Sequence, residues 1–236
     1  MGDFEGKNIL VLDMDADFIK REKTKPILSK LSKVRATRPQ PHLDDKIITA
    51  WNGLMIASLS RASRVLSDDR YYYAAEKSAD FIFSNLMSGS FLKRHYASGK
   101  AHVSAFSDDY SAMIHACIEL YQARFDEKWY KRALELQKTL DEKFWDKKDH
   151  AYFKTDGSDS KLIARNKPSY DGVKPSNNSL AAYNLLRLYH LSYNEDYNQK
   201  AQEIFSTFKA SLDNAPRSLT FMLVALDLNF DSTKEV

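Results

Sequence analysis

The feature that most constrains the fold is a repeat of helical hairpins. Three stretches of the 236-residue chain share one layout: an apolar helix, a short acidic turn, and a second helix opened by an aromatic residue. The turns are residues 67–69, 125–127 and 194–196, and the aromatic residues are Tyr71, Trp129 and Tyr197. Each aromatic residue follows the opening of its hairpin, at position 51, 109 or 177, by 20 residues. This agreement indicates three copies of one structural unit.

The two helices of each hairpin differ in polarity. The second helix of each pair has one polar face, whereas the first is apolar on nearly all sides, as in the segment 111–121. Apolar inner helices that are buried on both sides, with amphipathic helices outside them, predict an all-α (α/α) toroid. The hairpins open 58 and then 68 residues apart, a longer period than that of an open solenoid such as a tetratricopeptide array.

The extent of the repeat predicts an incomplete ring. Beyond the three hairpins we expect one helix over 24–35, with Ile27, Leu28 and Leu31 facing inward, and a last helix after Pro216. This gives about 8 of the 12 helices of a six-hairpin ring. Residues 1–40 hold an extended segment and one helix, the repeats occupy 41–230 (about 44–106, 107–175 and 176–230), and 231–236 form a tail. Short β-ribbons are expected at 89–96 and 150–155.

The composition of the chain argues against several kinds of binding partner and site. The net charge is +3, with 35 basic and 32 acidic residues interspersed, so we expect no nucleic-acid partner. The acidic start of the chain does not fit a signal peptide, and no apolar run approaches about 20 residues, so we expect a cytoplasmic protein without membrane contact. The single cysteine, Cys117, excludes an intrachain disulfide. We expect it to be a buried inert thiol, with a catalytic thiol as the alternative. The histidine spacing does not fit zinc, and we expect no metal and no cofactor.

Polar residues open each inner helix. Asp44 and Asp45 precede the first helix, with Trp51 and Asn52 about a turn further on. The second opens with residues 107–110 and the third with 176–179. If the inner helices run parallel around a ring, these groups and the free helix N–H groups meet at one mouth. Each Asp, Ser or Asn could instead be only a helix cap, although a cap needs one acid rather than two.

The same residues suit a sugar site. Paired carboxylates with aromatic and amide groups fit acid–base chemistry at a glycosidic or anomeric carbon. The candidate catalytic residues are Asp45 and Asp109, with Asp44, Asp108 and His42 beside them; His42 could equally be a plain loop histidine. The candidate substrate-binding residues are Trp51, Asn52, Tyr110, His115, Tyr170, Asp171, Asn177 and Asn178. The loop 164–175 could act as a lid whose Arg165 and Lys167 hold an acidic sugar such as a uronate, or it could be an ordinary connector.

Three segments resemble a known family. They are RPQPHLDDKIITAWNGLMIASLSRA, FSDDYSAMIHACIELY and SYDGVKPSNNSLAAYNLLRL, and they resemble the spermatogenesis-associated protein 20 family of thioredoxin-domain-containing proteins over about residues 4–230. The resemblance implies a toroid similar to those of six-hairpin glycosidases and N-acylglucosamine 2-epimerases, preceded in full-length relatives by a thioredoxin-like domain. The chain has no CxxC motif, so that domain's redox chemistry is not implied. Where the family has Pro-Ser-Gly-Asn-Ser, this chain has Asn177 in place of Gly, and Asn tolerates a left-handed backbone.

Two functions stay open from the sequence. The first is a carbohydrate-active domain, either epimerase-like with His42 and His115 as its bases, or glycoside-hydrolase-like with Asp45 and Asp109. The second is a non-catalytic scaffold that binds a sugar or a protein. The expected partners are a sugar or sugar-derived small molecule, and a second copy or the missing complementary part of the toroid.

Overall fold

The computed structural model describes residues 20–231, in two units, Met1–Asp44 and Asp45–Val236. Helix α1 (Lys20–Ala36) belongs to the first unit. Its Ile27, Leu28 and Leu31 are exposed within this unit, and the inward packing predicted for this face stays a prediction. Apolar spacing shows that a face exists but not that another element covers it. The predicted extended segment before this helix and the tail lie largely outside the described residues.

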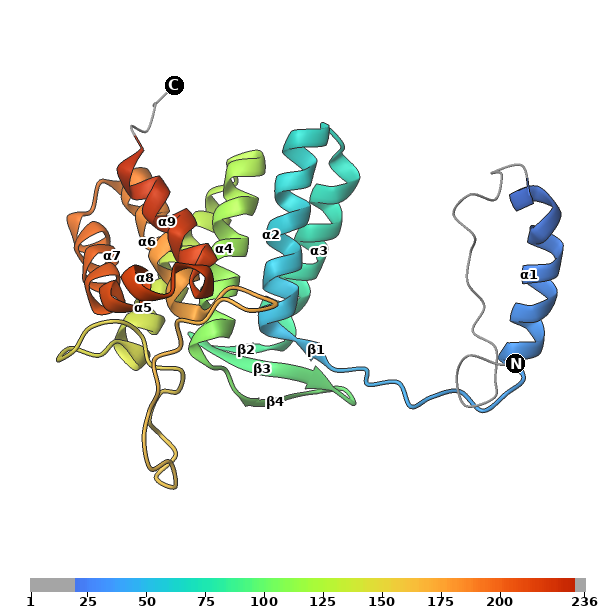
Figure 1. The fold of residues 1–236 in the computed structure, drawn as a ribbon, viewed down its shortest axis with the longest axis horizontal. Helices are drawn as coiled ribbons and strands as arrows, with labels where there is room; N and C mark the ends of the chain where they lie inside the picture. Colours follow the sequence, from blue (N-terminus) through green and yellow to red (C-terminus); the bar gives the residue numbers. More distant parts are fainter. Residues whose placement is uncertain (1–19, 232–236) are drawn as a thin grey trace. The chain divides into compact units, whose positions relative to one another are not determined.

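The second unit consists of three helical hairpins and a final helix (Figure 1). The inner helices α2 (Thr49–Leu66), α4 (Ser107–Arg124), α6 (Asn177–Ser192) and α9 (Thr220–Phe230) pack side by side in chain order. They run in the same direction. The outer helices α3 (Asp69–Asn85), α5 (Glu127–Phe144) and α7 (Glu195–Thr207) pack on α2, α4 and α6. This arrangement is the predicted all-α toroid architecture.

Two short elements lie between α7 and α9. A break at Phe208 ends α7, and the short helix α8 (Lys209–Asn214) follows it. Pro216 does not open the last helix. It opens a 3-10 turn, η1 (Pro216–Ser218), and α9 begins at Thr220. A proline fixes the backbone of a first turn but does not select between a 3-10 turn and an α-helix.

The three hairpin turns share one backbone conformation. The residue after each inner helix is left-handed, with φ of 51° to 57°, and the next residue caps the outer helix by accepting a hydrogen bond from the N–H two positions on. The left-handed residues are Ser67, Phe125 and Tyr193, and the capping residues are Asp68, Asp126 and Asn194. These positions keep the 58- and 68-residue spacing, which supports the repeat inferred from the sequence.

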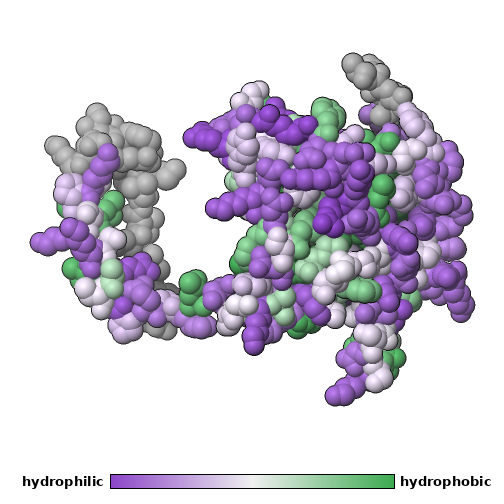
Figure 2. Space-filling view, turned by 180° about the vertical axis from the view of Figure 1, so that it is seen from behind, coloured by the Kyte–Doolittle hydropathy of each residue, from purple (hydrophilic) through white to green (hydrophobic). Residues whose placement is uncertain are grey.

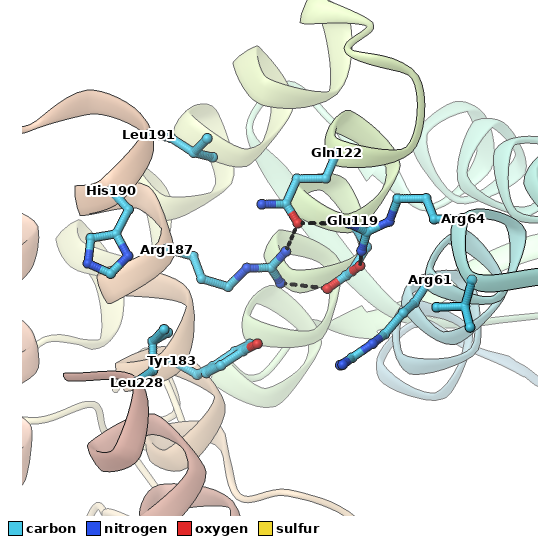
Figure 3. A pocket seen from close by; sticks show the side chains of 10 residues that line it. Arg61, Arg64, Glu119, Gln122, Tyr183, Arg187, His190, Leu191 and Leu228 are labelled. Atoms are coloured by element: carbon cyan, nitrogen blue, oxygen red, sulfur yellow. Dashed lines mark hydrogen bonds and ion pairs between the residues drawn. The ribbon is translucent and has the colours of Figure 1, made fainter. Parts of the chain in front are cut away.

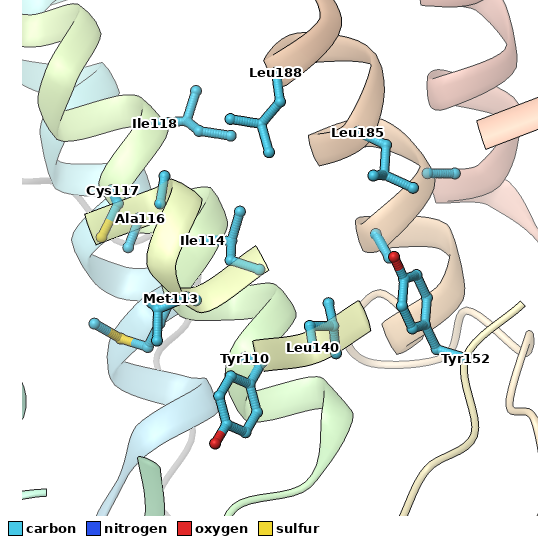
Figure 4. Packing of buried hydrophobic residues seen from close by; sticks show 14 of the residues in the cluster. Tyr110, Met113, Ile114, Ala116, Cys117, Ile118, Leu140, Tyr152, Leu185 and Leu188 are labelled. Carbon is cyan, nitrogen blue, oxygen red and sulfur yellow. The ribbon is translucent and has the colours of Figure 1, made fainter. Parts of the chain in front are cut away.

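The core surrounds α4, which is buried along most of its length. Met113, Ile114, Cys117 and Ile118 are fully buried among side chains of α5 and α6 (Figure 4). A helix covered on several sides needs apolar residues all round, which explains why its sequence lacks a polar face. Burial raises the pKa of the Cys117 thiol well above its ordinary value, so the thiol stays protonated, consistent with the expected inert role.

A glycine permits the close packing of α2 on α4. A Cβ atom at Gly53 would lie 2.8 Å from the backbone carbon and oxygen of Ala112. Because any side chain would overlap the neighbouring backbone, glycine at this position serves packing rather than chemistry.

A small sheet lies at the end where the inner helices begin (Figure 1). Its central strand β3 (Phe91–Ala97) pairs antiparallel with β1 (Ile47–Ile48), β2 (Met87–Ser88) and β4 (Lys100–Ser104). The ribbon predicted at 89–96 is therefore confirmed. The one predicted at 150–155 is reduced to a single bridge between Trp145 and Tyr152. The consecutive left-handed residues His150 and Ala151 turn the chain too tightly for a longer ladder.

The surface of the described chain is mainly polar. Hydrophilic residues cover most of the face of the second unit seen in Figure 2. Within residues 20–231, no helix is both long enough and apolar enough to cross a membrane. The same residues contain no group of three or more His, Cys, Asp or Glu side chains arranged to hold a metal ion.

Candidate functional site

A cavity of about 480 Å³ lies where α4 and α6 begin, and we call it the mouth cavity. Strand β3 contributes Arg94, α4 contributes Asp108, and the loop that leads into α6 contributes most of the rest. The remaining lining residues are Lys154, Pro168, Tyr170, Gly172, Val173, Lys174, Pro175, Ser176 and Asn177. This volume is typical of small-molecule sites. The cavity lies at the end of the inner helices where the sequence predicts a site.

Asp108 is the carboxylate that faces the mouth cavity, and it is held between two cations. Its Oδ1 lies 3.2 Å from a guanidinium nitrogen of Arg94, and its Oδ2 lies 3.3 Å from Nζ of Lys174. The Asp108 side chain is 13% exposed, so a ligand can reach it. A carboxylate flanked by an arginine and a lysine offers alternating acceptors and donors, the pattern that hydroxyl groups need.

Asp109 is buried behind Asp108 and contacts protein groups only. Its Oδ1 accepts a hydrogen bond from the N–H of Ala50 at 3.0 Å, and its Oδ2 accepts from the N–H of Phe106 and from Arg94, both at 2.9 Å. Burial, and next the charge of Asp108, raise the pKa of Asp109 to about 6, although Arg94 opposes the shift. The side chain has no exposed surface. Asp109 therefore joins α4 to the start of α2 and positions Arg94.

The acids ahead of α2 take no part in starting that helix. Strand β1 separates them from it, its N-cap is Ile48, and its first turn holds no acid. Asp45 is exposed, and the contact that Asp109 makes at α2 is with Ala50 rather than Asp45. His42 and Asp44 are exposed residues of the first unit. The structure therefore does not bring Asp45 and Asp109 together as a pair.

The predicted binding residues of α2 and the core of α4 do not line the mouth cavity either. Trp51 is 61% exposed, and the amide of Asn52 donates to the carbonyl of Ile48 at 2.9 Å, which satisfies it one turn back. The buried hydroxyl of Tyr110 accepts a hydrogen bond from the N–H of Leu92. Burial, and next the charge of a neighbouring arginine, lower the pKa of His115 to about 3, so its imidazole is neutral at ordinary pH.

The loop over the mouth cavity is anchored at Asp171. Its side chain accepts hydrogen bonds from Ser176 N (2.7 Å), Ser179 Oγ (3.0 Å), Phe221 N (2.8 Å) and Met222 N (3.1 Å). Asp171 is only 7% exposed, so it ties the loop to the starts of α6 and α9. Beside it, Tyr170 is 71% exposed and lines the cavity. The segment can therefore present Tyr170 to a ligand while its base stays fixed.

The two asparagines that open α6 have different environments. The amide nitrogen of Asn177 donates to Ser107 Oγ at 2.8 Å, but its buried Oδ1 has no hydrogen-bond partner among the described residues, at a site that lines the mouth cavity. An unsatisfied buried oxygen is costly and points to a missing donor. Asn178 is fully satisfied: it pairs with both backbone groups of Tyr152 and donates to the carbonyl of Pro168.

The basic groups of the cavity are not those expected from the sequence. Arg165 lies over the ring of Phe153 and donates to the carbonyl of Thr155, while Lys167 pairs with Asp146 at 2.6 Å. Both therefore stabilise the loop itself. The cavity is lined instead by Arg94, Lys154 and Lys174, and Arg94 precedes Asp108 by only 14 positions on the ribbon that enters α4. The position of Arg94 on the predicted ribbon, just ahead of α4, was the one feature of the sequence that could have indicated its place at the cavity.

Sequence comparison places the chain among known proteins. No family model matches it. Spermatogenesis-associated protein 20 of Homo sapiens is 32% identical over 220 residues, which is 89% of this chain. The chain is homologous to spermatogenesis-associated protein 20. The resemblance predicted from the sequence is thereby confirmed. The matched segment is 28% of the length of the human protein, so this chain spans less than a third of it.

Solved structures confirm the fold. A GH76 α-mannanase from Bacteroides thetaiotaomicron superposes with a TM-score of 0.63 at 14% identity, over 83% of this chain and 56% of the mannanase. Cellobiose 2-epimerase from Bacillus thermoamylovorans superposes with a TM-score of 0.58 at 15% identity, over 72% of this chain and 46% of the epimerase. At these identities the likeness establishes a shared helical toroid and leaves the chemistry of this chain open.

Proposed function

We propose that this domain binds a sugar or sugar-derived small molecule in the mouth cavity. The observation that carries the proposal is Asp108, held between Arg94 and Lys174 and accessible from the cavity. Tyr170 supplies an aromatic surface. A polyol has the hydroxyl groups to satisfy such a set. The mannanase and the epimerase that share the fold both act on sugars, which supports this choice of ligand class.

The charge of the cavity favours an acidic sugar. Arg94, Lys154 and Lys174 line it together with Asp108, and Arg94 is also paired with the buried Asp109, which leaves one positive charge uncompensated. A uronate, which carries a carboxylate beside its hydroxyl groups, complements this excess better than a neutral hexose does.

Catalysis needs a second acid or base in addition to Asp108. Glycoside hydrolases use two carboxylates across the scissile bond, and an epimerase needs a base to move a proton. Among the described residues Asp108 is the one acid that lines the mouth cavity, and Asp109 is enclosed by its hydrogen bonds. The mouth cavity therefore does not hold a carboxylate pair, and sugar binding is the function that the present geometry supports best.

Calorimetry and thermal unfolding test this proposal directly. Glucuronate, glucose and N-acetylglucosamine are titrated into the full chain. A ligand at 100 times its Kd adds about 2.7 kcal/mol, which raises the Tm by about 5–10 °C for a domain of this size. We expect glucuronate to bind best and Asp108→Asn to weaken binding at least about tenfold. The control Asp213→Asn, on the exposed face of α8, should bind normally. Absence of binding by all three sugars would refute the proposal.

The first and last inner helices, α2 and α9, support a second role of the domain as a scaffold. Trp51 and Met55 of α2 are 61% and 59% exposed, and Leu223 and Val224 of α9 are 38% and 48% exposed. This chain matches 56% of the mannanase chain. We infer that these edge helices bind a second copy of the chain. Sedimentation velocity should show a concentration-dependent dimer that Met55→Lys weakens, and a monomer at all concentrations would contradict the inference.

A further inference from the structure

A second cavity, of about 530 Å³, lies on the other half of the inner helices and is lined by their C-terminal turns (Figure 3). We call it the basic cavity. Helix α2 contributes Arg61 and Arg64, α4 contributes Glu119 and Gln122, and α6 contributes Arg187. The rest of its lining is mostly apolar or aromatic, and it shares no residue with the mouth cavity.

Arg187 is buried and rigidly held. It is 7% exposed and lies 2.8 Å from one oxygen of Glu119, while it donates to the Gln122 carbonyl oxygen at 2.6 Å. Its guanidinium also contacts His115 Nδ1 at 3.3 Å. The second oxygen of Glu119 pairs with Arg64. Glu119 and Gln122 therefore fix two arginines side by side, so a ligand that binds them need not order their side chains.

The cavity has an excess of positive charge. Three arginines face a single carboxylate, Glu119, and Arg61 has no ion pair among the described residues. Figure 3 shows the guanidinium of Arg61 extending toward Tyr183. The helix dipole accounts for only one of these residues, because Arg64 lies in the last turn of α2 while Arg61 and Arg187 lie further from their helix ends. Two positive charges are left uncompensated.

We propose that the basic cavity binds the phosphate group of a phosphorylated small molecule. A phosphate monoester is a dianion, which matches the two uncompensated charges, and arginine side chains offer paired N–H donors to phosphate oxygens. The cavity is larger than a phosphate group requires, and Tyr183, Leu191 and Leu228 form an apolar wall for the organic part. The phosphate lies against Arg61, Arg64 and Arg187, and the organic part contacts the wall.

The test is calorimetric titration of the full chain at fixed ionic strength. The probes are inorganic phosphate, glucose 6-phosphate and glucose, and the background variant Lys174→Gln removes a basic contact at the mouth cavity. We expect glucose 6-phosphate to bind at least about tenfold more tightly than inorganic phosphate, and glucose not to bind at this site. Arg61→Gln should weaken glucose 6-phosphate at least about tenfold, because a charge-assisted contact is lost. The control Arg132→Gln, an exposed α5 residue paired with Glu135, should bind normally.

Three results would overturn the proposal. The first is no saturable binding of either phosphate compound. The second is an unchanged affinity in Arg61→Gln, which would leave only a structural role for the cluster. The third is equal affinity for inorganic phosphate and glucose 6-phosphate, which would show that the organic part of the ligand does not contribute to binding. Because Arg61 lines the basic cavity and not the mouth cavity, the effect of Arg61→Gln reports on the basic cavity alone, and failure here leaves the sugar proposal at the mouth cavity untouched.

Discussion

Removal of the Asp171 carboxylate should destabilise the domain and release the loop over the mouth cavity. In Asp171→Ala three backbone N–H groups and one hydroxyl lose their acceptor. An unsatisfied buried donor costs about 1–3 kcal/mol, and water can enter the space, so we expect a loss of about 3–6 kcal/mol in the free energy of unfolding. In Asp171→Asn one oxygen remains as an acceptor, and we expect about 2–3 kcal/mol.

Urea unfolding followed by circular dichroism measures both variants against Asp213→Asn. Asp213 pairs with Lys209 on the exposed surface of α8, so its amide should change stability by no more than about 0.5 kcal/mol. The order of stability should be Asp213→Asn, then Asp171→Asn, then Asp171→Ala. A loss below about 1 kcal/mol in Asp171→Ala would refute the claim that these four hydrogen bonds hold the loop and the start of α9 together.

Three further predictions concern the packing, the turns and the pH dependence of this domain. Gly53→Ala should lower the free energy of unfolding by about 1–3 kcal/mol, because the added methyl group overlaps the backbone of Ala112. The control Ser58→Ala, on the exposed face of α2, should leave stability unchanged. Equal stabilities of the two variants would contradict the close approach of α2 to α4. Ser67→Gly should raise stability by about 0.5–1 kcal/mol, since glycine adopts the left-handed turn without strain, and a lower Tm would argue against it. Because the folded-state pKa of Asp109 is raised to about 6, the folded chain binds that proton more tightly than the unfolded chain does. Between about pH 4 and pH 7 wild-type stability should therefore fall about 2–3 kcal/mol further than that of Asp109→Asn in urea titrations; parallel profiles would contradict the shift.

Local pattern was enough to predict the hairpins. The 3- and 4-residue spacing of apolar side chains and the acidic turns are short-range properties, and the structure places the repeats where they indicated. The same pattern predicted the helix at 24–35, which lies within α1.

The candidate site depends on contacts between residues that are far apart in the sequence, and a local sequence pattern does not predict these. Asp44 and Asp45 stand just ahead of α2 and were natural candidates for its start, yet the acceptor for Ala50 N–H is Asp109, 59 positions away. The cavity at the mouth was expected from parallel helices, and Asp108, Tyr170 and Asn177 do line it. The pairing of Arg187 with Glu119 joins polar residues on two otherwise apolar helices, where neither one by itself indicates a partner.

The helical hairpins form the framework of the domain, and the loops between them carry the residues that line the mouth cavity. The inner helices α2, α4 and α6 have similar lengths of 18, 18 and 16 residues, so the increase from 58 to 68 residues lies in the segments that join an outer helix to the next inner one. Those segments, 86–106 and 145–176, carry Arg94, Lys154, Tyr170 and Lys174. What a toroid of this kind recognises can therefore be exchanged by grafting a connecting loop, with the helical framework left as it is.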